Sequence, residues 1–194
     1  MTSSFGDDNQ RFNLSEGDCP KRTKLKEMCR THWVERQNAF EVFLQLYLYV
    51  AKCLEGISGA NSASWNHDTV AGAHSLYLGK TDFVFIIALV STKNVMAYSK
   101  TLTIGLQGQG IDIVKAYKHI NVVTKCLQDV RGSVDRFSDE CFKQASKLAN
   151  EVGVTPSYPR TVGRMRHRTN YPAESAEEYY KRNLVIPLLD HFLR

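Results

Sequence analysis

The chain has 194 residues, of which 43% are hydrophobic and 23% are charged. This is the composition of an ordinary globular protein and excludes a fibrous or wholly disordered chain. The formal net charge of +5 at pH 7 permits an acidic partner such as nucleic acid but is too small to indicate one.

Membrane and secreted classes are disfavoured by the sequence. The longest apolar run, FVFIIALV, is less than half of the roughly 20 residues that a membrane-spanning helix needs. The first residues, MTSSFGDDNQ, lack the basic flank and apolar stretch of a secretory signal. Five scattered cysteines, an odd number, do not suggest a disulfide framework. We therefore expect reduced thiols and a nuclear or cytoplasmic protein that is not secreted.

The N-terminal part divides into an arm and a first helix. Residues 1–20 are polar, show no apolar period, and are predicted to be disordered, whereas residues 21–194 are predicted to form a helical domain. After a basic stretch, apolar residues recur every three or four positions from Trp33 to Ile57. This spacing predicts an amphipathic helix, which Gly56, Gly59 and the cluster of serine and asparagine residues around them should end.

Two further helices are predicted before residue 107. Either Asn66 or Asp68 is suited to cap a helix that runs to about Leu78, and either Thr81 or Asp82 is suited to cap the next one. The run FVFIIALV resembles a buried strand, but no turn residues follow it for about twenty positions and its apolar period continues. We therefore favour a helix, followed by a loop with three glycines at residues 105–110.

The clearest periodic signal extends from Ile113 to Val152. Its apolar spacing predicts one helix of about forty residues, about 60 Å long at 1.5 Å per residue. Gly132 is the interior position where a bend or a close approach is expected, and Gly153 and Pro156 should end the helix. The predicted fold is therefore all-α, an elongated helical bundle containing one very long helix.

The C-terminal part combines a basic loop with a last helix. Residues 156–172 contain no acidic residue, and their arginines are suited to bind phosphate oxygens. An equally simple role is pairing with acidic residues of the same bundle. A helix should begin near residues 173–175, with Pro187 kinking or splitting it. The candidate nucleic-acid-binding residues of this loop are Arg160, Arg164, Arg166 and Arg168.

No complete motif for catalysis or for metal binding is present. Cys29 and His32 have the spacing of half a zinc site, but no second half follows. No glycine-rich phosphate-binding motif, carboxylate pair or nucleophile with a recognisable context occurs. We therefore predict that the chain is not an enzyme, has no catalytic or metal-binding residues, and uses no cofactor or small-molecule substrate.

Four separated segments of the chain carry a family resemblance: CRTHWVERQNAFEVF, SLYLGKTDFVFIIALV, LTIGLQGQGIDIVKAY and YPRTVGRMRHRTNYPAESAEEYYKRNLVIPLLDHFL. They resemble one region of hAT-family transposase-derived proteins, the zinc finger MYM-type and repressor-of-the-inhibitor-of-the-protein-kinase group. The segments occur in the family's order and together cover about residues 21–194. The resemblance implies the helical insertion of an RNase H-like transposase, which interrupts a core carrying two aspartates and a glutamate.

The resemblance also assigns individual residues. The segment from Cys29 to Trp33 is similar to the family's Cys-x-Thr-Arg-Trp motif, so Trp33 matches a tryptophan that stacks on a displaced base. His32 stands where the family usually has arginine, and Met165 where relatives tend to have glutamine. These two departures leave the corresponding contacts open.

The resemblance places both catalytic aspartates before Cys29 and the glutamate beyond Arg194, so the chain is read as truncated at both ends. The leading hypothesis is a catalytically inactive, domesticated or decaying transposase-derived fragment that retains nucleic-acid binding, with DNA as partner. A second is a scaffold for a partner protein or a homo-oligomer, through a seam on the long helix from Ile113. A third is a truncated gene product without an independent function.

Overall fold

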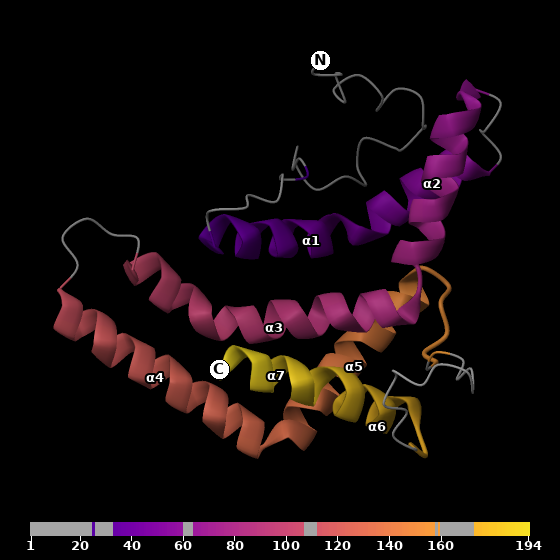
Figure 1. Cartoon of the computed structure of the whole chain (residues 1–194). Coiled ribbons are helices and arrows are strands. Elements are labelled where there is room, and N and C mark those ends of the chain that lie inside the picture. Colours follow the sequence, from indigo (N-terminus) through magenta and orange to yellow (C-terminus); the bar gives the residue numbers. More distant parts are fainter. Residues whose placement is uncertain (1–24, 26–32, 60–63, 107–111, 158, 160–172) are drawn as a thin grey trace.

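The computed structural model describes residues 25, 33–59, 64–106, 112–157, 159 and 173–194. Every regular element in these residues is helical (Figure 1), so the all-α prediction is confirmed for them. The longest described helix has 26 residues. The elements are α1 (Trp33–Ser58), α2 (His67–Lys80), α3 (Phe83–Leu106), α4 (Ile113–Gly132), α5 (Val134–Glu151), α6 (Ala176–Tyr180), the π-helical turn η3 (Lys181–Val185) and α7 (Ile186–Phe192).

Helix α3 is the centre of the arrangement. It contacts α1 on one side and α4 and α5 on the other, while α2 packs mainly on α1. Figure 1 shows α1 and α3 lying alongside each other, and α6, η3 and α7 lying between α3 and the angle formed by α4 and α5. The C-terminal helices therefore fill the space that α4 and α5 enclose.

Short polar side chains cap the first turn of four described helices, and at α4 the Asp112 side chain accepts a hydrogen bond from the Val114 amide at 2.9 Å. The Asn66 side chain accepts a hydrogen bond from the Thr69 amide at 2.7 Å, and the Asp82 side chain accepts one from the Val84 amide at 3.0 Å. The Ser175 hydroxyl accepts one from the Glu178 amide at 3.2 Å. These bonds satisfy amide groups that the first helical turn leaves without a partner. They confirm three predicted helix starts and the helical conformation of FVFIIALV.

The predicted forty-residue helix is wrong, because the chain breaks at Ser133. This residue has φ −111° and ψ 38°, and its amide donates to the carbonyls of Asp129 and Val130. Its hydroxyl also donates to the Asp129 carbonyl, at 2.9 Å. The result is two helices of 20 and 18 residues that meet at an angle (Figure 1). The bend expected at Gly132 lies next to this break.

The C-terminal end of α5 follows the prediction more closely. Gly153 has φ 73°, a left-handed conformation that a glycine adopts without strain. The Val154 amide donates to the Ala149 carbonyl at 2.9 Å, which pairs one of the last carbonyls of the helix. Gly153 therefore ends the helix as its position in the sequence suggested.

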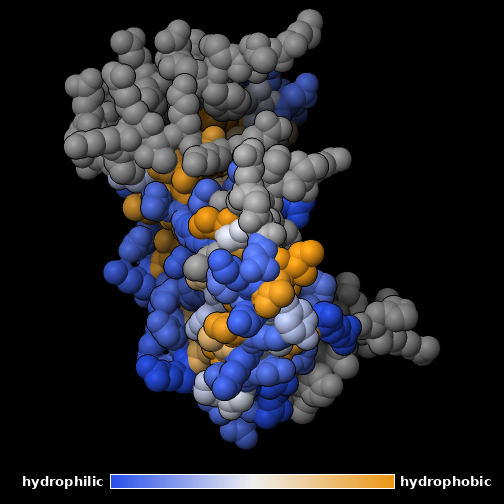
Figure 2. Space-filling view, turned by 90° about the vertical axis from the view of Figure 1, so that its left-hand side faces the viewer, coloured by the Kyte–Doolittle hydropathy of each residue, from blue (hydrophilic) through white to orange (hydrophobic). Residues whose placement is uncertain are grey.

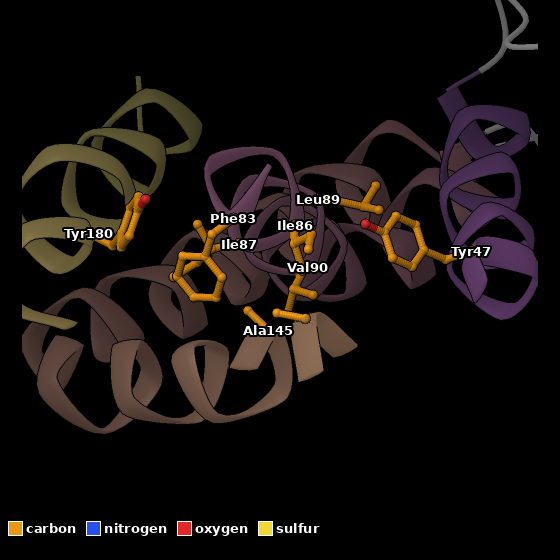
Figure 3. Close-up of a cluster of buried hydrophobic side chains, with 9 residues drawn as sticks. Tyr47, Phe83, Ile86, Ile87, Leu89, Val90, Ala145 and Tyr180 are labelled. Atoms are coloured by element: carbon orange, nitrogen blue, oxygen red, sulfur yellow. The ribbon is translucent and has the colours of Figure 1, made fainter. Parts of the chain in front are cut away.

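The larger of two hydrophobic clusters joins α1, α3, α5 and α6. In Figure 3, Phe83 and Ile87 lie near Tyr180 at one end, and Leu89 faces Tyr47 at the other. The Phe83 ring is 5.6 Å from the Phe142 ring and 5.4 Å from the Tyr180 ring, both edge to face. The buried members are Tyr47, Phe83, Ile86, Ile87, Leu89, Val90, Ala145, Ala149 and Tyr180.

The second cluster spans the break at Ser133. Leu127 before the break and Phe137 after it belong to one cluster with Leu189 of α7, which is fully buried. Both halves of the predicted long helix therefore share one core with the C-terminal helices. The buried members of this cluster are Val95, Leu127, Phe137, Cys141, Val185 and Leu189.

Pro187 splits the last helix, as predicted. Proline has no amide hydrogen, so it cannot donate the usual bond to the carbonyl four residues earlier. Just before it, the Ile186 amide donates to the Lys181 carbonyl, which is the wider spacing of a π-helical turn. This turn connects α6 to α7 and carries Val185, which is fully buried.

Helix α3 also contains one window, Phe83–Lys100, that is long and apolar enough to cross a membrane by length and composition. Of this window, 44% is buried inside the structure, including residues of the main cluster. The core helix of a water-soluble protein passes the same test, so the window is weak evidence for a membrane span.

The buried hydroxyl of Tyr47 predicts that the folded chain loses stability at alkaline pH. Its hydroxyl donates to the Lys80 carbonyl at 2.6 Å, and burial raises its pKa from 10.0 to about 12. Because the folded state binds this proton more tightly, stability is complete below pH 10 and declines toward about pH 12. We expect Tyr47→Phe to cost about 1 kcal/mol near neutral pH, through the lost hydrogen bond.

Urea unfolding at several pH values checks this. The stability advantage of the original chain over Tyr47→Phe should shrink as the pH rises above 10 and turn into a disadvantage before about pH 12, because a pKa raised from 10.0 to about 12 is worth more than the about 1 kcal/mol of the hydrogen bond. A difference that stays constant over this range would contradict the assignment.

Candidate interaction surface on helix α4

The structure does not describe the side chains of the predicted nucleic-acid-binding residues. Trp33 begins α1, but its side chain is not among those described, and the four loop arginines Arg160, Arg164, Arg166 and Arg168 lie outside the described residues. Cys29, His32 and Met165 also lie outside them. Their roles therefore stay predictions.

The described residues contain no group of three His, Cys, Asp or Glu side chains that could hold a metal ion. Cys141 is fully buried, and the Asn94 side-chain amide donates to its sulfur at 3.4 Å. Burial raises the pKa of the Cys141 thiol, which keeps it protonated at neutral pH and disfavours a nucleophilic role.

The first half of α4 carries the most exposed large apolar side chains. Ile113 is 83% exposed, Tyr117 65%, and Val114 60%. In the second half of the same helix, by contrast, Leu127 is buried and Val123 and Val130 pack against the second cluster. Among the described residues, the bundle therefore buries apolar side chains of α4 mainly near Ser133. Figure 2 faces the end of the molecule where α4 begins and shows apolar residues grouped on the surface among hydrophilic ones.

The exposed side chains form a continuous strip along the helix. At about 100° per residue, the series Val114, Lys118, Asn121 and Lys125 lies opposite the buried side of α4. The series Ile113, Tyr117 and Ile120 lies on one flank of that strip, at the spacing of a helix-packing seam. We call these seven exposed residues the outer face of α4: Ile113, Val114, Tyr117, Lys118, Ile120, Asn121 and Lys125.

The charge of this face is of one sign. Residues 113–128 include Lys115, Lys118 and Lys125 but no Asp or Glu, and no ion pair involves these lysines among the described residues. Lys100 and Lys181, elsewhere in the bundle, bind Glu41 and Asp135 at 2.8 Å. Lys115, Lys118 and Lys125 are all exposed and give this face a positive charge.

A second apolar feature is a groove between α1 and α3. It has a volume of about 220 Å³ and is lined by Phe40, Phe43, Phe85 and Leu89, with Leu25 beside them. The Lys80 ammonium lies 4.2 Å from the centre of the Phe85 ring, at the distance of a cation–π contact. The groove is smaller than the usual small-molecule site.

Sequence periodicity identified the apolar positions of α4 but did not distinguish those that this chain covers from those that it leaves exposed. Ile113, Tyr117 and Ile120 continue the same period as Leu127, so the pattern left open whether this chain or a partner covers them. The signal that distinguishes them is the density of lysine in residues 115–125 without any acidic residue. Such a segment is ill suited to a bundle interior.

Comparison with known proteins gives a distant relationship. No protein-family model and no solved structure matches the chain. It is 28% identical to the human 52 kDa repressor of the inhibitor of the protein kinase over 188 residues, which are 96% of this chain and 25% of that protein. The mouse protein of the same name is 28% identical over 172 residues, 88% of this chain and 23% of the relative. The chain is thus distantly related to these repressor proteins and spans about a quarter of their length.

Proposed function

We propose that this chain is a non-catalytic helical interaction module, derived from the helical insertion of an hAT-family transposase, that binds a protein partner through the outer face of α4. The observation that carries the proposal is the exposure of Ile113, Val114 and Tyr117 on adjacent turns of one helix. Contiguous apolar surface of this kind marks interaction sites more often than it occurs without a role.

Burial of these side chains supplies the driving force. Covering a large apolar side chain contributes about 1.5 to 3 kcal/mol, from which the cost of association and of ordering the interface is subtracted. The rest of the bundle supports the site rigidly, because Leu127 and Val130 fix the second half of α4 against α7. A partner would therefore meet a preformed helix and would not need to order it.

Nucleic-acid binding is the second candidate function. It is favoured by the exposed lysines of α4, and the resemblance adds Trp33 and the loop arginines. Phosphate contacts of lysine give an affinity that falls steeply with salt. Isoleucine and valine gain little from a phosphate backbone, however, so the apolar half of the outer face favours a protein.

A photo-crosslinking amino acid at position 117 tests the proposed function. In nuclear extract, it should form a protein adduct that the same probe at Leu78, an equally exposed position on α2, does not form. The adduct should disappear when Ile113→Ser is added. The absence of any position-specific adduct, or an adduct with nucleic acid alone, would exclude protein binding through this face.

A further inference from the structure

The outer face of α4 also indicates what kind of protein binds there. We infer that its partner is an acidic amphipathic helix, which packs along α4 with leucine-like side chains on Ile113, Val114 and Tyr117 and carboxylates beside Lys118 and Lys125. This inference rests on the proposed function and adds the shape and the charge of the partner to it.

The shape follows from the length and spacing of the face. From Ile113 to Lys125, the exposed strip covers 13 residues, about 18 to 20 Å at 1.5 Å per residue. Its apolar members lie three and four positions apart, which matches the ridges that another helix presents. A partner helix of about four turns would cover it, in the manner of helix pairing.

The charge excludes a second copy of the chain as the favoured occupant. In a pair of α4 helices, Lys118 and Lys125 of one copy would face the same lysines of the other, since residues 113–128 have no acidic residue to offset them. Juxtaposed like charges are unfavourable in helix pairs. Glutamate or aspartate on the partner would instead meet both lysines at the edge of the apolar strip.

Asn121 adds a preference for one register. It is exposed in the middle of the strip, between the apolar turn at Tyr117 and Lys125. A polar side chain at the centre of a helix pair costs stability unless it meets a polar side chain, and so selects the alignment in which it does. The partner is therefore expected to place a polar residue opposite Asn121.

Fluorescence anisotropy with three synthetic helical peptides tests the inference on the full chain. The first peptide has a leucine seam flanked by glutamates, the second has the same seam flanked by lysines, and the third is a scrambled form of the first with the same charge. We expect the first to bind at least about tenfold more tightly than either of the others, the size of effect that charge complementarity gives.

Charge reversal supplies the specific control. The double variant Lys118→Glu, Lys125→Glu should reverse the preference, so that the lysine-flanked peptide binds better than the glutamate-flanked one. Ile113→Ser should weaken the binding of both peptides. Lys147 is an exposed lysine on α5, so Lys147→Glu should leave the affinities of both peptides unchanged. Circular dichroism should show that all variants keep their helical content.

Other outcomes overturn the inference. Equal binding of the scrambled acidic peptide would mean a general attraction to acidic chains and no helix site. Tight binding of duplex DNA or of anionic lipid vesicles that competes with the first peptide and is lost in the double lysine variant would assign the face to that partner instead. Failure of the acidic peptide together with a specific protein adduct at position 117 would exclude the acidic helix but leave the proposed function intact.

Discussion

Phe83→Ala is expected to lower the free energy of unfolding by about 3 to 5 kcal/mol, the usual cost of removing a buried aromatic ring from a packed core. Phe83 is 1% exposed at the start of α3. Its ring contacts Phe142 of α5 and Tyr180 of α6 edge to face. One substitution therefore weakens the contacts of α3 with two other helices and removes a large part of the about 5 to 15 kcal/mol that stabilises an ordinary domain.

Urea denaturation followed by circular dichroism measures this effect. Leu78→Ala is the matched control, because Leu78 is 58% exposed on α2 and should change the free energy of unfolding by less than about 0.5 kcal/mol. A loss below about 1 kcal/mol for Phe83→Ala would show that Phe83 is not held in a tightly packed core.

Leu189→Ala is the second substitution with a large expected effect. Leu189 is fully buried in α7 and packs in the cluster that includes Leu127 and Phe137. We expect a loss of about 2 to 5 kcal/mol, concentrated in the contacts of α7 with α3, α4 and α5. Because the second half of α4 is held by this cluster, the outer face of α4 should also lose its rigid support.

Hydrogen exchange locates this loss. Amides of α7 and of the second half of α4 should exchange faster in Leu189→Ala, while α1 and α2, which contact neither helix closely, should change less. His191→Ala, a substitution at an exposed position of the same helix, serves as the control. Uniformly faster exchange would mean that the two hydrophobic clusters unfold as one cooperative unit.

The break at Ser133 explains the main error of the sequence-based fold. A single residue that leaves the helical conformation shifts the apolar period only slightly, so Val130, Val134 and Phe137 still read as one continuous series. The cluster that joins α4 to α7 forms between segments that lie more than 50 residues apart in the sequence. No local pattern contains that information.

The candidate site was anticipated in part. A seam on the helix from Ile113 was one of the hypotheses, and the structure leaves Ile113 and Tyr117 of that seam exposed. The arginine loop and Trp33 were chosen from charge and from the resemblance, and they stay predictions because their side chains lie outside the described residues. The lysines of α4 were not singled out, since each reads as a solvated position of an amphipathic helix.

The sequence by itself determined most of the helices. Their apolar spacing, the pairs of candidate caps Asn66 or Asp68 and Thr81 or Asp82, the start near Ser175, and the interruptions at Gly153 and Pro187 are local properties of neighbouring residues. Only the tertiary structure decided where the apolar positions of α4 are covered and where they are exposed. Periodicity shows that a helix has an apolar side, but whether a neighbour covers that side depends on contacts between segments far apart in the chain. In α4 the neighbours cover Leu127 and leave Ile113 exposed, and this difference produces the surface proposed to bind an acidic helix.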